Sequence, residues 1–154
     1  MVATNGGYPA DLNIYQSIKG MAAAAKAVRD GGAIVLASEC REGAGKADYA
    51  EFLASRESPA ALMALLLEPG FQRIDQWGIQ CQAMAQLKAD IYLYSALDRE
   101  TTKAAHLLHC EDISRTVAEL AAKHEGERGA PAKILALPFG FQAIPQTPAA
   151  VGVK

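Results

Sequence analysis

The sequence predicts an α/β fold, a three-layer α/β/α sandwich on a mainly parallel sheet. Short apolar runs at 33–37, 91–94 and 134–137 are typical of strands buried on both faces. Segments with helical periodicity separate these runs, and such alternation favours parallel strands joined by right-handed crossovers. The length of 154 residues fits one domain. We therefore expect a single Rossmann-like domain over residues 1–154.

The first elements are a strand end at 2–4, a glycine-bearing turn at 5–9 and a long helix. We predict that Asp11 caps this helix and that the glycines at 31–32 end it. Its apolar face repeats every three or four residues, at Ile14, Ile18, Met21, Ala25 and Val28. Because 2–4 looks like only the end of a strand, we expect either an unusually short first strand or a chain excised from a longer one.

The strand at 33–37 opens into a polar loop at 38–46. Asp48 and Glu51, three residues apart, predict a capping box for a helix that reaches residue 56. Ser58 as N-cap and Pro59 as first helical residue predict the next helix. The Glu-Pro-Gly sequence at 68–70 is expected to end it.

In the second half, Asp75 is expected to cap a helix in which Trp77, Cys81 and Met84 share a face. The strand at 91–94 follows, then a helix at 99–109 and another at 115–124 capped by Ser114. After the strand at 134–137, we expect the tail from residue 138 to lie irregularly on the surface. The 31 alanines fit such a helix-rich chain.

Charge and composition exclude several classes of protein. The formal net charge is −2, with 15 Lys+Arg and 17 Asp+Glu, so the basic footprint of a nucleic-acid binder is missing. The apolar runs fall short of the roughly 18–20 residues of a membrane span, and residues 1–5 lack the character of a secretory signal. Three widely spaced cysteines without a CxxC pair indicate reduced thiols, so we expect a cytoplasmic protein.

Ligands of open α/β sheets bind beyond the carboxyl ends of the strands, which selects the loops 5–9, 38–46 and 95–98. Gly6 and Gly7 in the first loop, and Gly43 and Gly45 in the second, could hold an anion on backbone N–H groups. Neither loop matches a dinucleotide or P-loop fingerprint. Turn formation is therefore the simpler interpretation of these glycines.

Three polar residues early in the first helix can converge on one patch. Tyr15 and Lys19 are four residues apart, and Gln16 is three residues from Lys19. A cation, an amide and a phenol suit a small anion such as a 2-hydroxy carboxylate. From periodicity alone, a tyrosine at the core edge with a solvated lysine and glutamine is the simpler alternative.

The tryptophan and the histidines are weaker candidates for site residues. Trp77, the single tryptophan, is more often a core anchor than the wall of a ligand site. His106 and His109 lie three residues apart and lack the HExxH frame of a zinc helix, so we expect no metal site. The sequence shows no catalytic set of its own.

Residues 4–21, TNGGYPADLNIYQSIKGM, closely resemble the opening of the C-terminal domain of the nickel-dependent lactate racemase family, with its TNGGYPxDxNxYQxxKGM pattern. The likeness continues more loosely to about residue 137, through the glycines at 31–32, ECREGAG at 39–45 and Asp-Gln-Trp at 75–77. Glu42 departs from the family's usual aspartate, residues 101–110 look private to this chain, and the PFGF close at 138–141 also differs. The substrate is therefore left open.

The resemblance implies a two-domain enzyme that interconverts stereoisomers of 2-hydroxy acids through a nickel-pincer nucleotide. The nickel-binding and acid/base residues belong to the family's N-terminal catalytic domain, so we expect this chain alone to bind no cofactor and to be inactive. The match assigns substrate or cofactor contacts to Tyr15, Gln16 and Lys19, with Trp77 nearby. Its expected partners are that N-terminal domain and a 2-hydroxy acid. Two alternatives are a free-standing module for a small anion or nucleotide, and a structural domain without a ligand.

Overall fold

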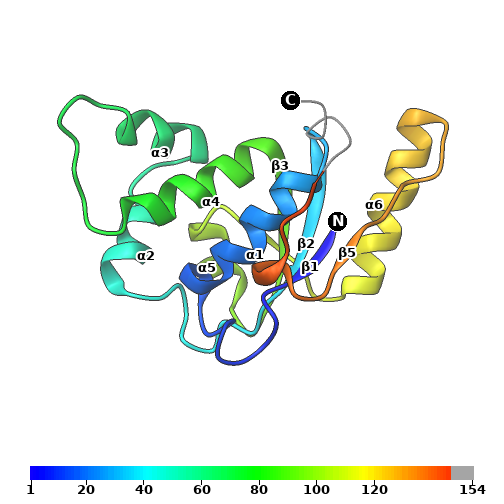
Figure 1. Ribbon diagram of the computed structural model, residues 1–154, viewed down its shortest axis with the longest axis horizontal. Helices are drawn as coiled ribbons and strands as arrows, with labels where there is room; N and C mark the ends of the chain where they lie inside the picture. The colour runs from blue at the N-terminus through cyan, green and yellow to red at the C-terminus, as the bar shows by residue number, and fades with distance from the viewer. Residues whose placement is uncertain (147–154) are drawn as a thin grey trace.

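The computed structural model describes residues 1–146 and contains one five-stranded parallel sheet (Figure 1). The strand order is β4-β3-β2-β1-β5. The strands are β1 (Val2–Thr4), β2 (Gly32–Ala37), β3 (Ala89–Tyr94), β4 (Leu108–His109) and β5 (Ala136–Leu137). The predicted α/β class and the parallel pairing are confirmed.

The helices lie on both faces of the sheet. Strands β1 to β4 follow one another across the sheet, so right-handed crossovers place their connecting helices on one face. These helices are α1 (Ile14–Ala27), α2 (Ala47–Ala54), α3 (Pro59–Leu66), α4 (Gln76–Lys88) and α5 (Arg99–Ala104). The chain then returns to pair β5 with β1, and α6 (Ile113–Arg128) crosses on the opposite side, as Figure 1 shows. None of the described helices is long and apolar enough to cross a membrane.

The core lies between the sheet and the layer that holds α1 and α4. Ile14, Ile18 and Met21 of α1 are fully or almost fully buried and belong to the same cluster as Leu36 of β2 and Ile79 of α4. Each buried side chain of this size contributes about 1.5–3 kcal/mol relative to an exposed one. The core therefore fixes α1 and α4 side by side, with α1 above the centre of the sheet.

Three predicted helix starts were wrong in their caps. Asn13, not Asp11, caps α1, because its side chain accepts a hydrogen bond from the Gln16 amide at 2.9 Å. Asp112, not Ser114, caps α6. The predicted capping box of Asp48 is also wrong, since that residue lies inside the first turn of α2.

The predicted ends of three helices differ as well, since α6 runs to Arg128 rather than to residue 124. Helix α1 ends at Ala27, because Val28 is already extended, and α2 ends at Ala54 rather than residue 56. The cap of α3 is as predicted, with Ser58 accepting from the Ala61 amide.

The helix predicted over 99–109 is a short α5 followed by β4. His106 has a positive φ of 57°, which stops the helix, and Leu108 then pairs with Tyr92 of β3. The face predicted for α4 also differs: Ile79 and Gln82 are among its buried residues, and Trp77 and Met84 are exposed.

The described residues from 138 onward only partly form the irregular surface tail that was predicted. β5 begins at Ala136, two residues later than predicted, and Leu135 before it is about half exposed. Gly140 begins a 3₁₀ turn, η1 (Gly140–Gln142), and is buried against Thr4 and Gly20. The predicted surface tail is therefore wrong at η1, and residues 147–154 lie outside the described part.

Candidate functional site

The start of α1 is held by the loop that follows β2. The Ile14 and Tyr15 amides donate to the Gly43 and Ala44 carbonyls, each at 3.2 Å. Asn13 accepts hydrogen bonds from the next two amides. Its side-chain oxygen accepts from the Gln16 amide, and its backbone carbonyl accepts from the Ser17 amide. The N–H groups that open α1 are therefore used internally and are not free for an anion.

Asn5 joins the end of β1 to α1. Its side chain is fully buried, donates to the Gln16 carbonyl at 3.0 Å and accepts from the Gly20 amide at 3.0 Å. It also donates to the Ala10 carbonyl. The sequence indicates only a turn at Asn5, because nothing in the neighbouring residues shows that its side-chain amide bridges two elements.

The glycines beside Asn5 have left-handed backbones, with φ of 82° at Gly6 and 80° at Gly7. A Cβ on Gly6 would lie 2.5 Å from the Phe141 ring, so the chain closes tightly over this turn. Gly7 has open space beside it. Only Gly7 of these two therefore has room for a neighbouring molecule.

Tyr15 is held on several sides. Its ring meets those of Tyr49 and Trp77 edge to face, with centroids 5.2 and 5.7 Å apart. Its hydroxyl donates to Asp75 Oδ1 at 3.2 Å. Burial, and then the bond to Asp75, raises the pKa of Tyr15 above its usual range, so the phenol stays protonated at neutral pH.

Gln16 and Lys19 lie on the same helix, with the Lys19 ammonium donating to Gln16 Oε1 at 2.7 Å. The structure thus brings together Lys19 with Gln16, and Tyr15 with Trp77, near the starts of α1 and α4. We call these four residues the α1–α4 patch. It offers a cation, an amide and two aromatic rings, which together can bind and orient a small carboxylate.

Two neighbours of the patch, Asp75 and Gly45, make contacts that the sequence did not predict. Asp75 precedes α4 with a left-handed φ of 60° and makes no cap bond, because its carboxylate binds Tyr15 and Lys46 instead. Gly45 closes the other side of Tyr15, since a Cβ there would lie 3.1 Å from Tyr15 Cβ. These contacts join segments far apart in the sequence, so local spacing gave no signal for them.

The histidines lie apart from the patch. His106 Nε2 contacts the Leu53 carbonyl at 3.0 Å, and His124 Nδ1 contacts Arg29 at 3.3 Å. Within residues 1–146, no group of three His, Cys, Asp or Glu side chains could hold a metal ion.

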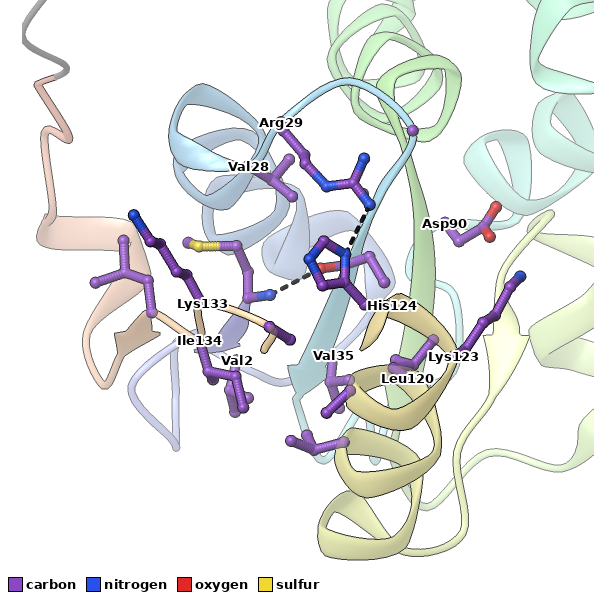
Figure 2. Close-up of a pocket in the computed structure, with 18 of the residues that line it drawn as sticks. Val2, Val28, Arg29, Val35, Asp90, Leu120, Lys123, His124, Lys133 and Ile134 are labelled. Atoms are coloured by element: carbon purple, nitrogen blue, oxygen red, sulfur yellow. Dashed lines mark hydrogen bonds between the residues drawn. The ribbon is translucent and has the colours of Figure 1, made fainter. Parts of the chain in front are cut away.

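Two hollows mark the surface. One, of about 580 Å³, lies between α6 and the sheet and contains none of the predicted site residues (Figure 2). Its floor includes Val35 and Leu120, and its rim carries Arg29 with His124. The other, of about 740 Å³, lies at the carboxyl ends of β1 to β4 and includes Gly7.

Comparisons with known proteins agree on one relationship. A family model described as the lactate racemase C-terminal domain matches residues 1–144. The lactate racemase of Thermoanaerobacterium thermosaccharolyticum is 30% identical over 149 residues, which cover 94% of this chain and 34% of that protein. The lactate racemase of Lactiplantibacillus plantarum is 31% identical over 146 residues, which cover 93% and 34%.

A solved structure shows the same similarity. The lactate racemase apoprotein from Thermoanaerobacterium thermosaccharolyticum matches with a TM-score of 0.83 and 29% identity, over 93% of this chain and 34% of that one. The chain thus spans 34% of the length of the curated relatives it matches.

Proposed function

The chain belongs to the lactate racemase C-terminal domain family, and on this premise we propose that it forms one wall of the active site of a lactate racemase-like 2-hydroxy acid racemase or epimerase. Its partner in this role is an N-terminal catalytic domain. This domain closes the cleft between the two and contacts the substrate or cofactor.

The α1–α4 patch is the observation that carries the proposal. Lys19 is exposed, and its ammonium can pair with a substrate carboxylate while Gln16 donates a second hydrogen bond. The rings of Tyr15 and Trp77 contact each other and form an aromatic surface, and the Tyr49 ring packs edge to face against Tyr15. The patch therefore has the groups that bind a small hydroxy acid and hold it in one orientation.

Helix α4 supports the presence of a partner domain. Trp77, Met84 and Leu87 face outward along one side of the helix and are 50%, 55% and 55% exposed. Such a stripe is unusual on a free surface and typical of an interaction site. It begins in the patch at Trp77, so a catalytic domain that closes over the patch would also cover Met84 and Leu87.

The groups that the patch contains indicate which part of the reaction each domain carries. In this proposal a nickel-pincer nucleotide, held mainly by the N-terminal domain, supplies the removal and return of hydride at the substrate α-carbon. The patch has no carboxylate or imidazole of its own to act as general acid or base. Its residues bind, orient and shield the substrate, and the isolated chain is expected to be inactive.

The alternative of a free-standing anion or nucleotide module depends on the glycine loops. The amides that open α1 already donate to the loop 43–45 and to Asn13, and the Glu42 and Gly43 amides donate to the Leu12 and Cys40 carbonyls, so none of these N–H groups is free for a phosphate. The structure thus favours the two-domain proposal.

The test compares the isolated chain with the same chain joined to an N-terminal catalytic domain of the family carrying its cofactor. We expect interconversion of D- and L-lactate, or of another 2-hydroxy acid, only in the joined form. Racemisation by the isolated chain would contradict the proposal. Tight binding of nucleotides to the isolated chain in calorimetry would instead favour the binding module.

A further inference from the structure

A cleft at the carboxyl edge of the sheet contains buried polar groups that the proposed function does not use. Its volume is about 740 Å³, and it is lined by the last residues of four strands: Thr4, Ala37, Tyr94 and His109. It shares no residue with the α1–α4 patch. Clefts at this edge are where open α/β sheets bind ligands.

Asp11 is a buried carboxylate that lines this cleft. Its side chain belongs to a residue that is only 8% exposed, and Oδ2 accepts a hydrogen bond from the Glu39 amide at 3.2 Å. The other oxygen, Oδ1, is buried and has no hydrogen-bond partner within residues 1–146. A buried carboxylate oxygen without a donor is costly, so this atom calls for a group that donates to it.

The charges around Asp11 indicate which kind of donor is missing. The two other carboxylates of the cleft are already paired, Glu39 with Arg41 and Glu111 with Arg99. In the described part of the chain, no lysine or arginine forms an ion pair with Asp11. A cation would therefore both donate to Oδ1 and form the ion pair that Asp11 lacks within residues 1–146.

His109 adds a second acceptor to the same cleft. Its Nδ1 is buried and also has no partner within residues 1–146. With the proton on Nε2, Nδ1 accepts a hydrogen bond, as Asp11 Oδ1 does. In the hollow beside α6, Arg29 and His124 contact each other (Figure 2), and none of the residues with a buried unpartnered side-chain atom in the described part of the chain lines that hollow.

We propose that this cleft binds a protonated amino or guanidino group, which donates to Asp11 Oδ1, with His109 Nδ1 as a second acceptor in the cleft. The group can belong to a small molecule or to a basic side chain of another protein segment. The site is independent of the role proposed for the α1–α4 patch, and a separate binding measurement tests it.

The experiment titrates the intact 154-residue chain with propylammonium and with methylguanidinium, observed by NMR at the Glu39 amide and the His109 ring. Tetramethylammonium, a cation without N–H donors, and lactate serve as controls at the same ionic strength. We expect saturable shifts at both residues with the two donors only. The variant Asp11→Asn keeps the shape of the side chain and should weaken binding roughly tenfold to a hundredfold.

Glu111→Gln is the matched control, because Glu111 lies in the same cleft but is already paired with Arg99, and it should bind as the parent does. If Asp11→Asn does not fold, the His109 variant His109→Phe, which removes only the second acceptor, replaces it and should weaken binding. Shifts that do not saturate, that tetramethylammonium reproduces, or that persist unchanged in Asp11→Asn would overturn the proposal. Binding of Nα-acetyl-lysine amide as strong as that of propylammonium would assign the group to a side chain. Binding of propylammonium without binding of Nα-acetyl-lysine amide would assign it to a small molecule.

Discussion

The Asp75 carboxylate accepts a hydrogen bond from the Tyr15 hydroxyl, with 3.2 Å between Oδ1 and the phenol oxygen. Asp75 stands directly before α4, the position from which an aspartate side chain ordinarily caps a helix. Its φ of 60° is left-handed, and its side chain makes no bond to the α4 amides. The carboxylate instead links Tyr15 to Lys46, whose ammonium lies 3.4 Å away. The start of α4 is thus shaped to hold the tyrosine of α1.

Replacing Asp75 with Asn should lower the pKa of Tyr15. Burial is the larger cause of the raised pKa and remains, while the negative charge and the bond to the carboxylate are lost. The pKa should therefore fall toward 10 without reaching it. Alkaline titration of the phenol, assigned by NMR, measures the change. Asparagine also tolerates a left-handed backbone, so the loop should keep its shape.

Asp48→Asn is the control for that titration, because Asp48 is an exposed carboxylate on α2. It should leave the pKa of Tyr15 unchanged. An unchanged pKa in Asp75→Asn would show that Asp75 does not govern the phenol.

Replacing Asn5 with Ala should destabilise the fold by about 2–5 kcal/mol, because several buried backbone groups lose their partner at once. The Gly20 amide and the Gln16 carbonyl are among them. Urea unfolding followed by circular dichroism measures the loss. One ordinary hydrogen bond contributes about 1 kcal/mol to stability. A free energy of unfolding within about 1 kcal/mol of the parent would therefore contradict the bridging role of Asn5.

Two glycine-to-alanine changes should act in opposite directions. At Gly20 a Cβ would lie 3.1 Å from Asn5 Oδ1 and 3.2 Å from Leu36 Cδ1, so the packing of α1 on the sheet must shift. At Gly126, within α6, nothing lies within 4 Å. Gly126→Ala should therefore stabilise the fold by up to about 1 kcal/mol through helix propensity, and Gly20→Ala should destabilise it. Thermal unfolding of both variants tests the pair, and equal effects would contradict it.

Stability should decline as the pH rises past about 10. The Tyr49 hydroxyl is buried and donates to Gln82 Oε1 at 2.6 Å, and burial raises its pKa far above the ordinary value of 10. The pKa of Tyr15 is raised as well. The unfolded chain therefore loses these protons first, so the stability is fully present below pH 10 and is lost above it.

Urea unfolding at several pH values from 8 to 11 measures this dependence. Tyr49→Phe has no phenol to ionise at that position, so its free energy of unfolding should fall less steeply above pH 10. At pH 8 it should be lower than that of the parent by about 1–3 kcal/mol, because Gln82 loses its donor. A slope equal to that of the parent would show that Tyr49 does not cause the alkaline loss.

The sequence predicted the sheet better than the ends of its elements. The apolar runs of β2 and β3 are long enough to be recognised, whereas β4 has two residues and follows a helical segment. Helix starts were harder, because Asp11 and Asn13 both suit a cap and only the tertiary position of Asp11 decides between them. Helix α4 has apolar residues on two faces, so periodicity could not show which face is buried.

The grouping of the candidate site followed from the sequence only in part. Helical spacing predicts that Tyr15, Gln16 and Lys19 converge, and the structure shows the contact between Lys19 and Gln16. The contact between Tyr15 and Trp77 depends on how α1 packs against α4. No local pattern encodes that packing, and the carboxylate of Asp75 could not be predicted for the same reason.

Replacing Lys19 with Ala should reduce turnover in a two-domain protein that joins this chain to a catalytic domain of the family. Loss of a charge-assisted contact to the substrate costs about 1.5–3 kcal/mol, which lowers kcat/KM by roughly tenfold to 150-fold. Gln16→Ala should act in the same direction, and the double variant should lose less than the sum because the two side chains contact each other. Lys26→Ala is the matched control, since Lys26 is an exposed lysine in the last turn of the same helix. If Lys19→Ala turns over as fast as Lys26→Ala, the patch does not bind the substrate carboxylate.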